Sequence, residues 1–157
     1  GIATWFLLGK PWFMPASFAA RQLQSILPRL EQDHIEAYRN QSWCKNIAYR
    51  AGKFSKTSRP TTCNLFQGEP LAFDETAQVV FSNLRQSLLL TGLNVNFLNA
   101  SFEEGKLKKA EFHLDCSLCS RTRYVYEPNY VLQEDMGKEM WFDAVNQTWY
   151  IVNEDWN

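Results

Sequence analysis

The sequence is short of glycine and of net charge, and each shortage argues against a class of function. Seven glycines in 157 residues leave few places for a glycine-rich loop that cradles phosphate. A formal net charge of −1 gives the chain as a whole no electrostatic reason to bind nucleic acid. The motifs G-x-S-x-G and H-E-x-x-H and the Rossmann fingerprint are also absent, so the sequence carries no local signature of an enzyme.

Hydrophobic and aromatic side chains, by contrast, are plentiful. They make up 45% and 15% of the chain, which is enough to bury a core and argues against general disorder. The length fits one domain, and no internal repeat, heptad run or low-complexity tract divides it. We expect a single domain over residues 15–157, preceded by a separate segment at residues 1–14.

This N-terminal segment contains an uncharged WFLL run at residues 5–8, followed by Lys10 and Trp12. The run is too short to cross a bilayer, which takes about 20 residues, but Trp and Lys are typical of the membrane interface. We expect either the remnant of a membrane anchor or an arm whose aromatic side chains pack on the domain's own core. The anchor interpretation brings the domain close to a membrane and places it outside the cytoplasm.

Three N-x-S/T sequons, at Asn40, Asn99 and Asn146, match the acceptor pattern of N-glycosylation. Such asparagines lie on the surface of secreted proteins. Together with the anchor interpretation they favour an extracytoplasmic domain, whether periplasmic, secreted or membrane-anchored.

Four cysteines, Cys44, Cys63, Cys116 and Cys119, allow two disulfides in three pairings. The Cys116-x-x-Cys119 pair lies between two strand-like runs, whereas a thioredoxin-like motif opens a helix. A Cys₄ zinc site prefers a second such pair, which the chain lacks. We therefore expect no metal and no cofactor, and either free buried thiols or a Cys44–Cys63 disulfide.

The first predicted helix follows Ser17, a residue type favoured at the N-cap. Hydrophobic residues then recur mostly at three- and four-residue steps from Phe18 to Tyr38, which is typical of a helix. Pro28 interrupts this stripe. Because proline removes a helix hydrogen bond, we expect a kink or two helices meeting there.

A second helix is predicted after Asp74, which is favoured as its N-cap. It should end at Gly92, because glycine readily adopts the left-handed conformation that closes a helix. Residues 41–72, between the two helices, show no hydrophobic period. We therefore expect a long irregular segment there, with a short helix or strand at 43–50.

From residue 94 onward the hydrophobic residues recur with a period of two, which predicts strands. We expect a first hairpin whose three-residue loop, with Gly105 in a bulge, sets Leu98 opposite Ala110. A third strand over Arg121–Glu127 should stop at Pro128.

A second hairpin over residues 140–152 is predicted to turn at Asn146-Gln147. A two-residue loop there places residues on two faces: Phe142, Ala144, Trp149 and Ile151 on one, and Trp141, Asp143, Val145, Tyr150 and Val152 on the other.

These elements define an α+β fold, with two N-terminal helical segments packed on a curved antiparallel sheet of about four strands. The order of elements is similar to that of the cystatin-like and NTF2-like folds, in which a curved sheet wraps around helices. Because one architecture serves many functions, this similarity implies the fold alone.

The second hairpin is apolar on both faces, whereas a sheet face without helices is normally polar. Either the segment 41–72 covers this face, or the face lines a ligand pocket or a partner surface. Tyrosine and tryptophan offer flat contact area with a polar tip. The predicted ligand-binding residues are therefore Tyr124, Tyr126, Tyr130, Trp141 and Tyr150.

His113 is the catalytic candidate, because Glu111 and Asp115 flank it at strand spacing and all three side chains should point the same way. A carboxylate beside an imidazole orients it and raises its pKa, which suits a general base. The same residues also fit a solvated strand face, since Lys109 continues the polar row.

Three functions follow as hypotheses. The first is a non-enzymatic extracytoplasmic domain that presents an aromatic sheet face to a small hydrophobic ligand or a protein partner, close to a membrane and without nucleic acid. The second is a small hydrolase or isomerase that uses His113 with Asp115 or Glu111. The third is a structural domain of an envelope assembly.

Overall fold

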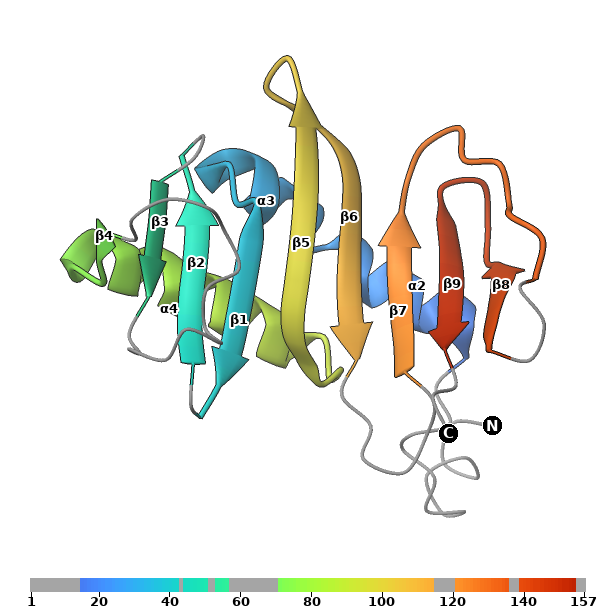
Figure 1. Cartoon of the computed structure of the whole chain (residues 1–157), viewed down its shortest axis with the longest axis horizontal. Coiled ribbons are helices and arrows are strands. Elements are labelled where there is room, and N and C mark those ends of the chain that lie inside the picture. The colour runs from blue at the N-terminus through green and yellow to red at the C-terminus, as the bar shows by residue number, and fades with distance from the viewer. Residues whose placement is uncertain are drawn as a thin grey trace.

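The computed structural model describes residues 15–42, 44–50, 53–56, 71–114, 121–135 and 139–154. The expected N-terminal arm, residues 1–14, lies outside this part of the chain. The described residues form three helices and nine strands (Figure 1). In chain order these are α2 (Ala16–Gln24), α3 (Leu27–Asp33), β1 (Ala37–Gln41), β2 (Cys44–Tyr49), β3 (Lys53–Lys56), β4 (Leu71–Ala72), α4 (Glu75–Leu90), β5 (Val95–Glu103), β6 (Lys106–Leu114), β7 (Arg121–Tyr126), β8 (Met140–Ala144) and β9 (Trp149–Glu154).

The strands form one sheet in the order β4-β3-β2-β1-β5-β6-β7-β9-β8. Only the pairing of β3 with β4 is parallel. The α+β class and the antiparallel sheet are therefore confirmed. The expected number of about four strands is wrong, because seven strands, β1, β2 and β5–β9, already make a continuous antiparallel sheet.

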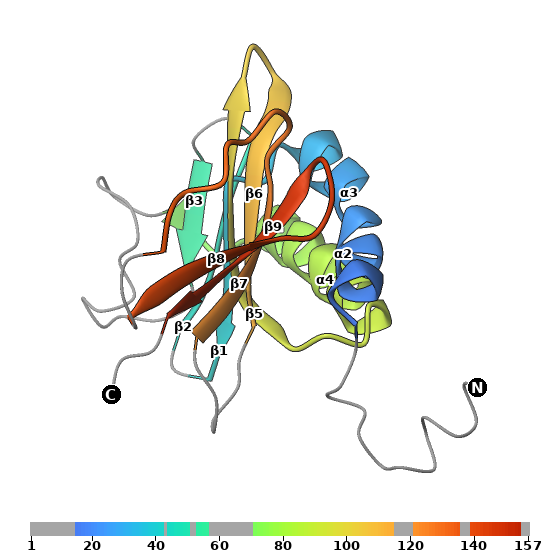
Figure 2. The same ribbon diagram turned by 90° about the vertical axis from the view of Figure 1, so that its right-hand side faces the viewer.

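All three helices lie on one face of this twisted sheet (Figure 2). The core lies between them and the strands, and it joins helix residues such as Leu23, Leu30 and Leu84 to Leu98 and Phe112 of the sheet. Burial of these side chains is the main favourable term that holds the two layers together. Among the described residues, no helix has both the length and the hydrophobicity that a membrane span requires.

The N-terminal helical segment breaks in two, as Pro28 predicted, and this proline lies in the first turn of α3 where it costs no hydrogen bond. Its N-cap is Pro15 rather than Ser17. The predicted extension to Tyr38 is wrong, because α3 ends at Asp33. His34 follows in the left-handed conformation, with φ 50°, and the chain turns into β1.

Helix α4 has the predicted bounds. The Asp74 carboxylate accepts a hydrogen bond from the backbone N–H of Ala77 at 2.8 Å, which is the expected N-cap contact. Gly92 follows the helix with φ 76°, the left-handed conformation that favours glycine.

The segment 41–72 is not wholly irregular. Strand β2 fulfils the prediction of a short element at 43–50, and β3 and β4 extend the sheet beyond it. Residues 57–70 lie outside the described part of the chain. Ordered strands account for this segment better than a thirty-residue loop, which is uncommon in a compact domain.

The β5–β6 hairpin turns at Glu104-Gly105, two residues that both have positive φ, as a type I′ turn requires. An irregularity between Ser101 and Phe102 adds one residue to β6. Leu98 consequently faces Phe112, and the predicted pairing with Ala110 is wrong. A two-residue turn alone would move the apolar side chains of β6 to the opposite face of the sheet. The extra residue of the bulge moves them back, so the predicted apolar face is kept.

In the β8–β9 hairpin, the Asn146 side chain widens the loop. Its Oδ1 accepts hydrogen bonds from the backbone N–H groups of Thr148 and Trp149, each at 2.9 Å. Phe142 therefore pairs with Val152. A two-residue loop would have paired it with an adjacent residue of β9. The predicted register of β9 is therefore wrong by one residue. Because such a shift moves every side chain of a strand to the other face, the predicted faces of the hairpin are wrong as well.

Candidate functional site on the outer face

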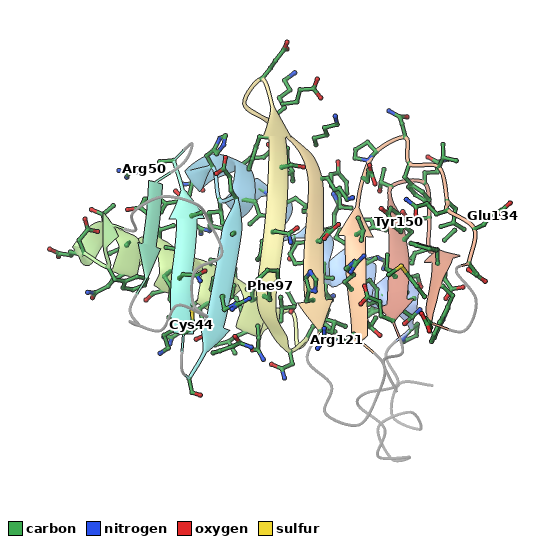
Figure 3. The ribbon with its side chains drawn as sticks, in the orientation of Figure 1. Cys44, Arg50, Phe97, Arg121, Glu134 and Tyr150 are labelled. Atoms are coloured by element: carbon green, nitrogen blue, oxygen red, sulfur yellow. The ribbon has the colours of Figure 1, made fainter. Side chains whose placement is uncertain are left out.

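The face of the sheet that is turned away from the three helices, here called the outer face, carries a row of side chains that crosses five strands. Directly paired residues of neighbouring strands lie on the same face, and Tyr38 and Leu98 are in the helix-side core. The row therefore consists of Arg39, Phe97, His113, Arg123 and Val152. Figure 3 shows Phe97, Arg121 and Tyr150 against the ribbon of β5, β7 and β9.

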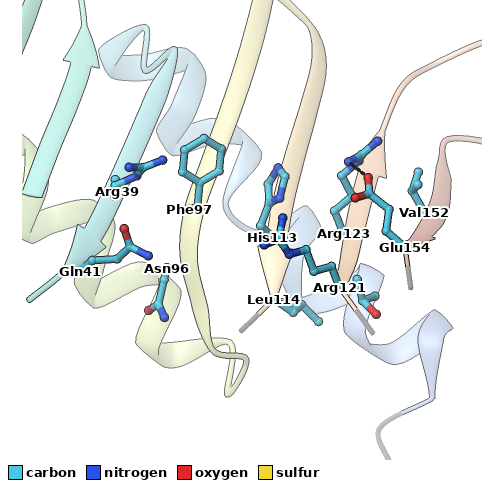
Figure 4. Close-up of a pocket in the computed structure, with 11 residues that line it drawn as sticks. Arg39, Gln41, Asn96, Phe97, His113, Leu114, Arg121, Arg123, Val152 and Glu154 are labelled. Atoms are coloured by element: carbon cyan, nitrogen blue, oxygen red, sulfur yellow. Dashed lines mark hydrogen bonds and ion pairs between the residues drawn. The ribbon is translucent and has the colours of Figure 1, made fainter. Parts of the chain in front are cut away.

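A pocket of about 550 Å³ lies along this row. Its described lining residues come from β1, β5, β6, β7 and β9, with Asn96 and Leu114 near the strand ends (Figure 4). They are Arg39, Gln41, Asn96, Phe97, His113, Leu114, Arg121, Thr122, Arg123, Val152 and Glu154. A pocket of this size suits a small ligand.

Three flat side chains contact one another in series at the centre of this pocket. The guanidinium carbon of Arg39 lies 5.0 Å from the centroid of the Phe97 ring, a cation–π contact. The Phe97 and His113 rings meet edge to face, with centroids 4.8 Å apart and an angle of 88°. The three strands β1, β5 and β6 thereby build a wall of three planar groups, in which the Phe97 and His113 rings are perpendicular to each other.

The far side of the pocket is positively charged. Arg123 Nη1 donates to Glu154 Oε1 at 2.6 Å, and the exposed Arg121 lies on the same strand. Glu154 is the one acidic residue among the described lining residues, against three arginines. The described lining residues therefore carry more positive than negative charge.

His113 is neutral at pH 7 in this setting. Burial lowers its pKa below the ordinary 6.5, and the charges of Arg123 and Arg121 lower it further, although the carboxylates of Glu111 and Glu154 oppose them. Among the described residues, the carboxylate oxygen nearest to His113 Nε2 is Glu111 Oε2 at 3.9 Å, which is too far for a hydrogen bond.

Buried polar atoms without a hydrogen-bond partner are concentrated at this pocket. Within the described part of the chain they include His113 Nε2, Arg123 Nε and Gln41 Oε1, all from lining residues. Buried polar groups in native proteins are normally paired. A bound ligand or water would supply the missing partners.

A second outer-face cluster is satisfied internally. The Tyr150 hydroxyl donates to Glu127 Oε1 at 2.8 Å, and Lys109 Nζ lies 3.9 Å from the same oxygen. The Tyr130 ring packs on Tyr150, with centroids 4.7 Å apart. Burial and the contact with Glu127 raise the pKa of Tyr150, so this hydroxyl stays protonated.

The structure does not gather the five predicted ligand-binding residues into one surface. Tyr124 is buried in the core, and Tyr126 packs against Trp149 in that core. Trp141 shares a face with Asn153, opposite to Phe142. Tyr130 and Tyr150 pack on each other, away from that core.

The catalytic candidates are only partly described. His113 and Glu111 share the outer face, as their spacing predicted, and Asp115 lies outside the described residues. Cys63, Cys116 and Cys119 also lie outside them, whereas Cys44 is disulfide-bonded. A free thiol at Cys44 is therefore excluded. Within the described part of the chain, no three His, Cys, Asp or Glu side chains are grouped to hold a metal ion.

Sequence reasoning missed Phe97, Arg121 and Arg123. Phe97 is out of phase with the apolar face of β5, because Leu98 next to it points into the core. An aromatic residue on the polar side of an alternating strand is the signal that could have indicated this site.

Comparison with known proteins finds no match for this chain among protein-family models, curated proteins or solved structures. The function is therefore inferred from the residues and geometry of the outer face.

Proposed function

We propose that the protein is a non-enzymatic binding domain that holds a small aromatic ligand in the outer-face pocket. The observation that supports this most is the contact series of Arg39, Phe97 and His113 along a pocket of about 550 Å³. Planar side chains held on three adjacent strands are rigid, so an aromatic ligand can stack on one of them or meet it edge to face at low entropic cost.

Binding fits the site better than acid–base catalysis. A histidine base is normally oriented by a carboxylate at about 2.6–3.2 Å. Here Glu111 is 3.9 Å from His113 Nε2, the nitrogen that has no hydrogen-bond partner. Glu154, the acidic residue among the described lining residues, pairs with Arg123 instead.

A small ligand fits the outer face better than a large protein partner. The apolar side chains there pack into a cluster of their own, in which Val125, Phe142 and Val152 are 0–9% exposed. Protein partners dock on extended exposed apolar patches. The outer face offers a lined pocket in place of such a patch.

The same proposal locates the domain outside the cytoplasm. The disulfide at Cys44 supports this, because disulfides persist in oxidising compartments and are rare in the cytosol. The three sequons are a second, independent support from the sequence.

A pair of related probes, naphthalene-2-carboxylate and naphthalene-2-carboxamide, tests the proposed function by isothermal titration calorimetry. We expect saturable binding of at least one probe, and about tenfold weaker binding to Phe97→Ala, because the variant loses the central ring of the pocket. Phe18→Ala is the matched control, since Phe18 is 45% exposed on α2, on the helix side of the sheet.

The proposed function fails if neither probe binds the wild-type protein. It also fails if Phe18→Ala weakens binding as much as Phe97→Ala does. Circular dichroism of both variants establishes that the folded domain is being compared.

A further inference from the structure

Resting on the proposed binding function, we propose that the natural ligand of the pocket is a flat organic anion, with a carboxylate or phosphate head group. Its ring would contact Phe97 and His113, and its head group would face Arg121 and Arg123. Figure 4 shows the two rings between Arg39 on one side and these two arginines on the other.

Charge is the first argument for an anion. Three arginines line the pocket, and the single described acidic lining residue, Glu154, is paired with Arg123. Arg121 and Arg123 alternate along β7, so both point to the outer face. An anion would offset the surplus of positive charge, and a neutral or cationic ligand would not.

Two buried nitrogens give the second argument. His113 Nε2 and Arg123 Nε have no hydrogen-bond partner within the described part of the chain. They belong to residues that are directly paired on β6 and β7, so they reach the same region of the pocket. Arg123 Nε is always a donor, and His113 Nε2 is one when it carries the ring proton. Anionic oxygens are the strongest acceptors for both.

The wall of planar groups gives the third argument. The Arg39 guanidinium lies over the Phe97 ring, and the His113 ring, perpendicular to that of Phe97, continues the row toward the arginines of β7. An extended hydrocarbon would use the wall but offer no acceptor to Arg121 or to Arg123 Nε. A free inorganic ion would use the arginines but leave the wall bare. A ring that carries an anionic group uses both.

The test compares dissociation constants of wild-type protein for naphthalene-2-carboxylate, its neutral carboxamide and 2-naphthyl phosphate. We expect at least one anion to bind about tenfold more tightly than the carboxamide. Arg121→Gln should weaken the anions about fivefold and leave the carboxamide unchanged. The matched control is Arg21→Gln, an exposed arginine on α2, which should change none of the constants.

The anionic probes distinguish the two head groups: preference for the carboxylate or for the phosphate ester supports the inference and names the head group. Equal affinity for the carboxamide and both anions overturns it while the proposed function stands. Loss of anion affinity in Arg21→Gln equal to that in Arg121→Gln also overturns it, because the effect would then reflect the overall charge of the protein. Absence of binding by all three probes overturns both proposals together.

Discussion

Replacing Trp149 by alanine is expected to lower the free energy of unfolding by about 3–5 kcal/mol, the largest effect of any single substitution considered for this domain. Trp149 is 1% exposed, and its ring packs against Phe112 and Tyr126 with centroids 5.8 and 5.6 Å away. Its Nε1 donates to Gln24 Oε1 at 2.7 Å, which ties β9 to α2. The substitution leaves a cavity and a broken link between the two layers.

Urea unfolding followed by circular dichroism measures this change. Trp149→Phe keeps most of the ring volume and loses the hydrogen bond, so its cost should be smaller, about 1–3 kcal/mol. Trp141→Ala is the matched control, because Trp141 is only half-buried on the edge strand β8. Equal destabilisation by the two alanine substitutions would show that Trp149 does not hold the helix layer to the sheet.

Loss of the disulfide at Cys44 is expected to have the second largest effect, a fall of about 2–4 kcal/mol in the free energy of unfolding. Cys44 begins β2, is 1% exposed, and its sulfur accepts from Asn46 Nδ2 at 3.5 Å. A covalent link from this buried position restricts the unfolded chain much more than the folded one.

The measurement is urea unfolding of the wild-type protein and of Cys44→Ala, each with and without a phosphine reductant. The oxidised wild-type protein should be the most stable of the four samples, and the reductant should destabilise it more than it destabilises the variant. If the oxidised wild-type protein and the variant unfold at the same urea concentration, the link at Cys44 contributes nothing to stability.

The elements that the sequence predicts well are those whose signals are local. Helix α4 carries its N-cap at Asp74 and its stop at Gly92, so its bounds follow from nearby residues alone. The helix break at Pro28 is local in the same sense. Strand β1 was not predicted. Tyr38 lies four residues after His34, a spacing typical of a helix, so the hydrophobic pattern of the helix continues into this strand. Only the partners β2 and β5 make the segment a strand.

Strand register was the least predictable feature, because small local contacts decide it. The irregularity after Ser101 adds one residue to β6, and the side-chain hydrogen bonds of Asn146 widen the β8–β9 loop. A shift of one residue moves every side chain of a strand to the other face. The predicted tyrosine surface depended on such a register, and the structure divides it between the core and the outer face.

The candidate site shows the same limit. His113 stood out in the sequence because charged residues flank it on its own strand. The residues that make its surroundings a pocket, Phe97 and Arg123, belong to β5 and β7 and become its neighbours only through strand pairing. The local pattern predicts the β5–β6 hairpin but not its register, and it carries no information on the pairing of β6 with β7.

The location of a bound probe tests the central claim most directly. Intermolecular nuclear Overhauser effects between naphthalene-2-carboxylate and the isotope-labelled protein report which side chains the ring contacts. The outer-face pocket predicts contacts from the naphthalene protons to the rings of Phe97 and His113. Contacts only to the exposed apolar side chains of the helix layer, such as Phe18 and Leu90, would contradict a binding site on the outer face.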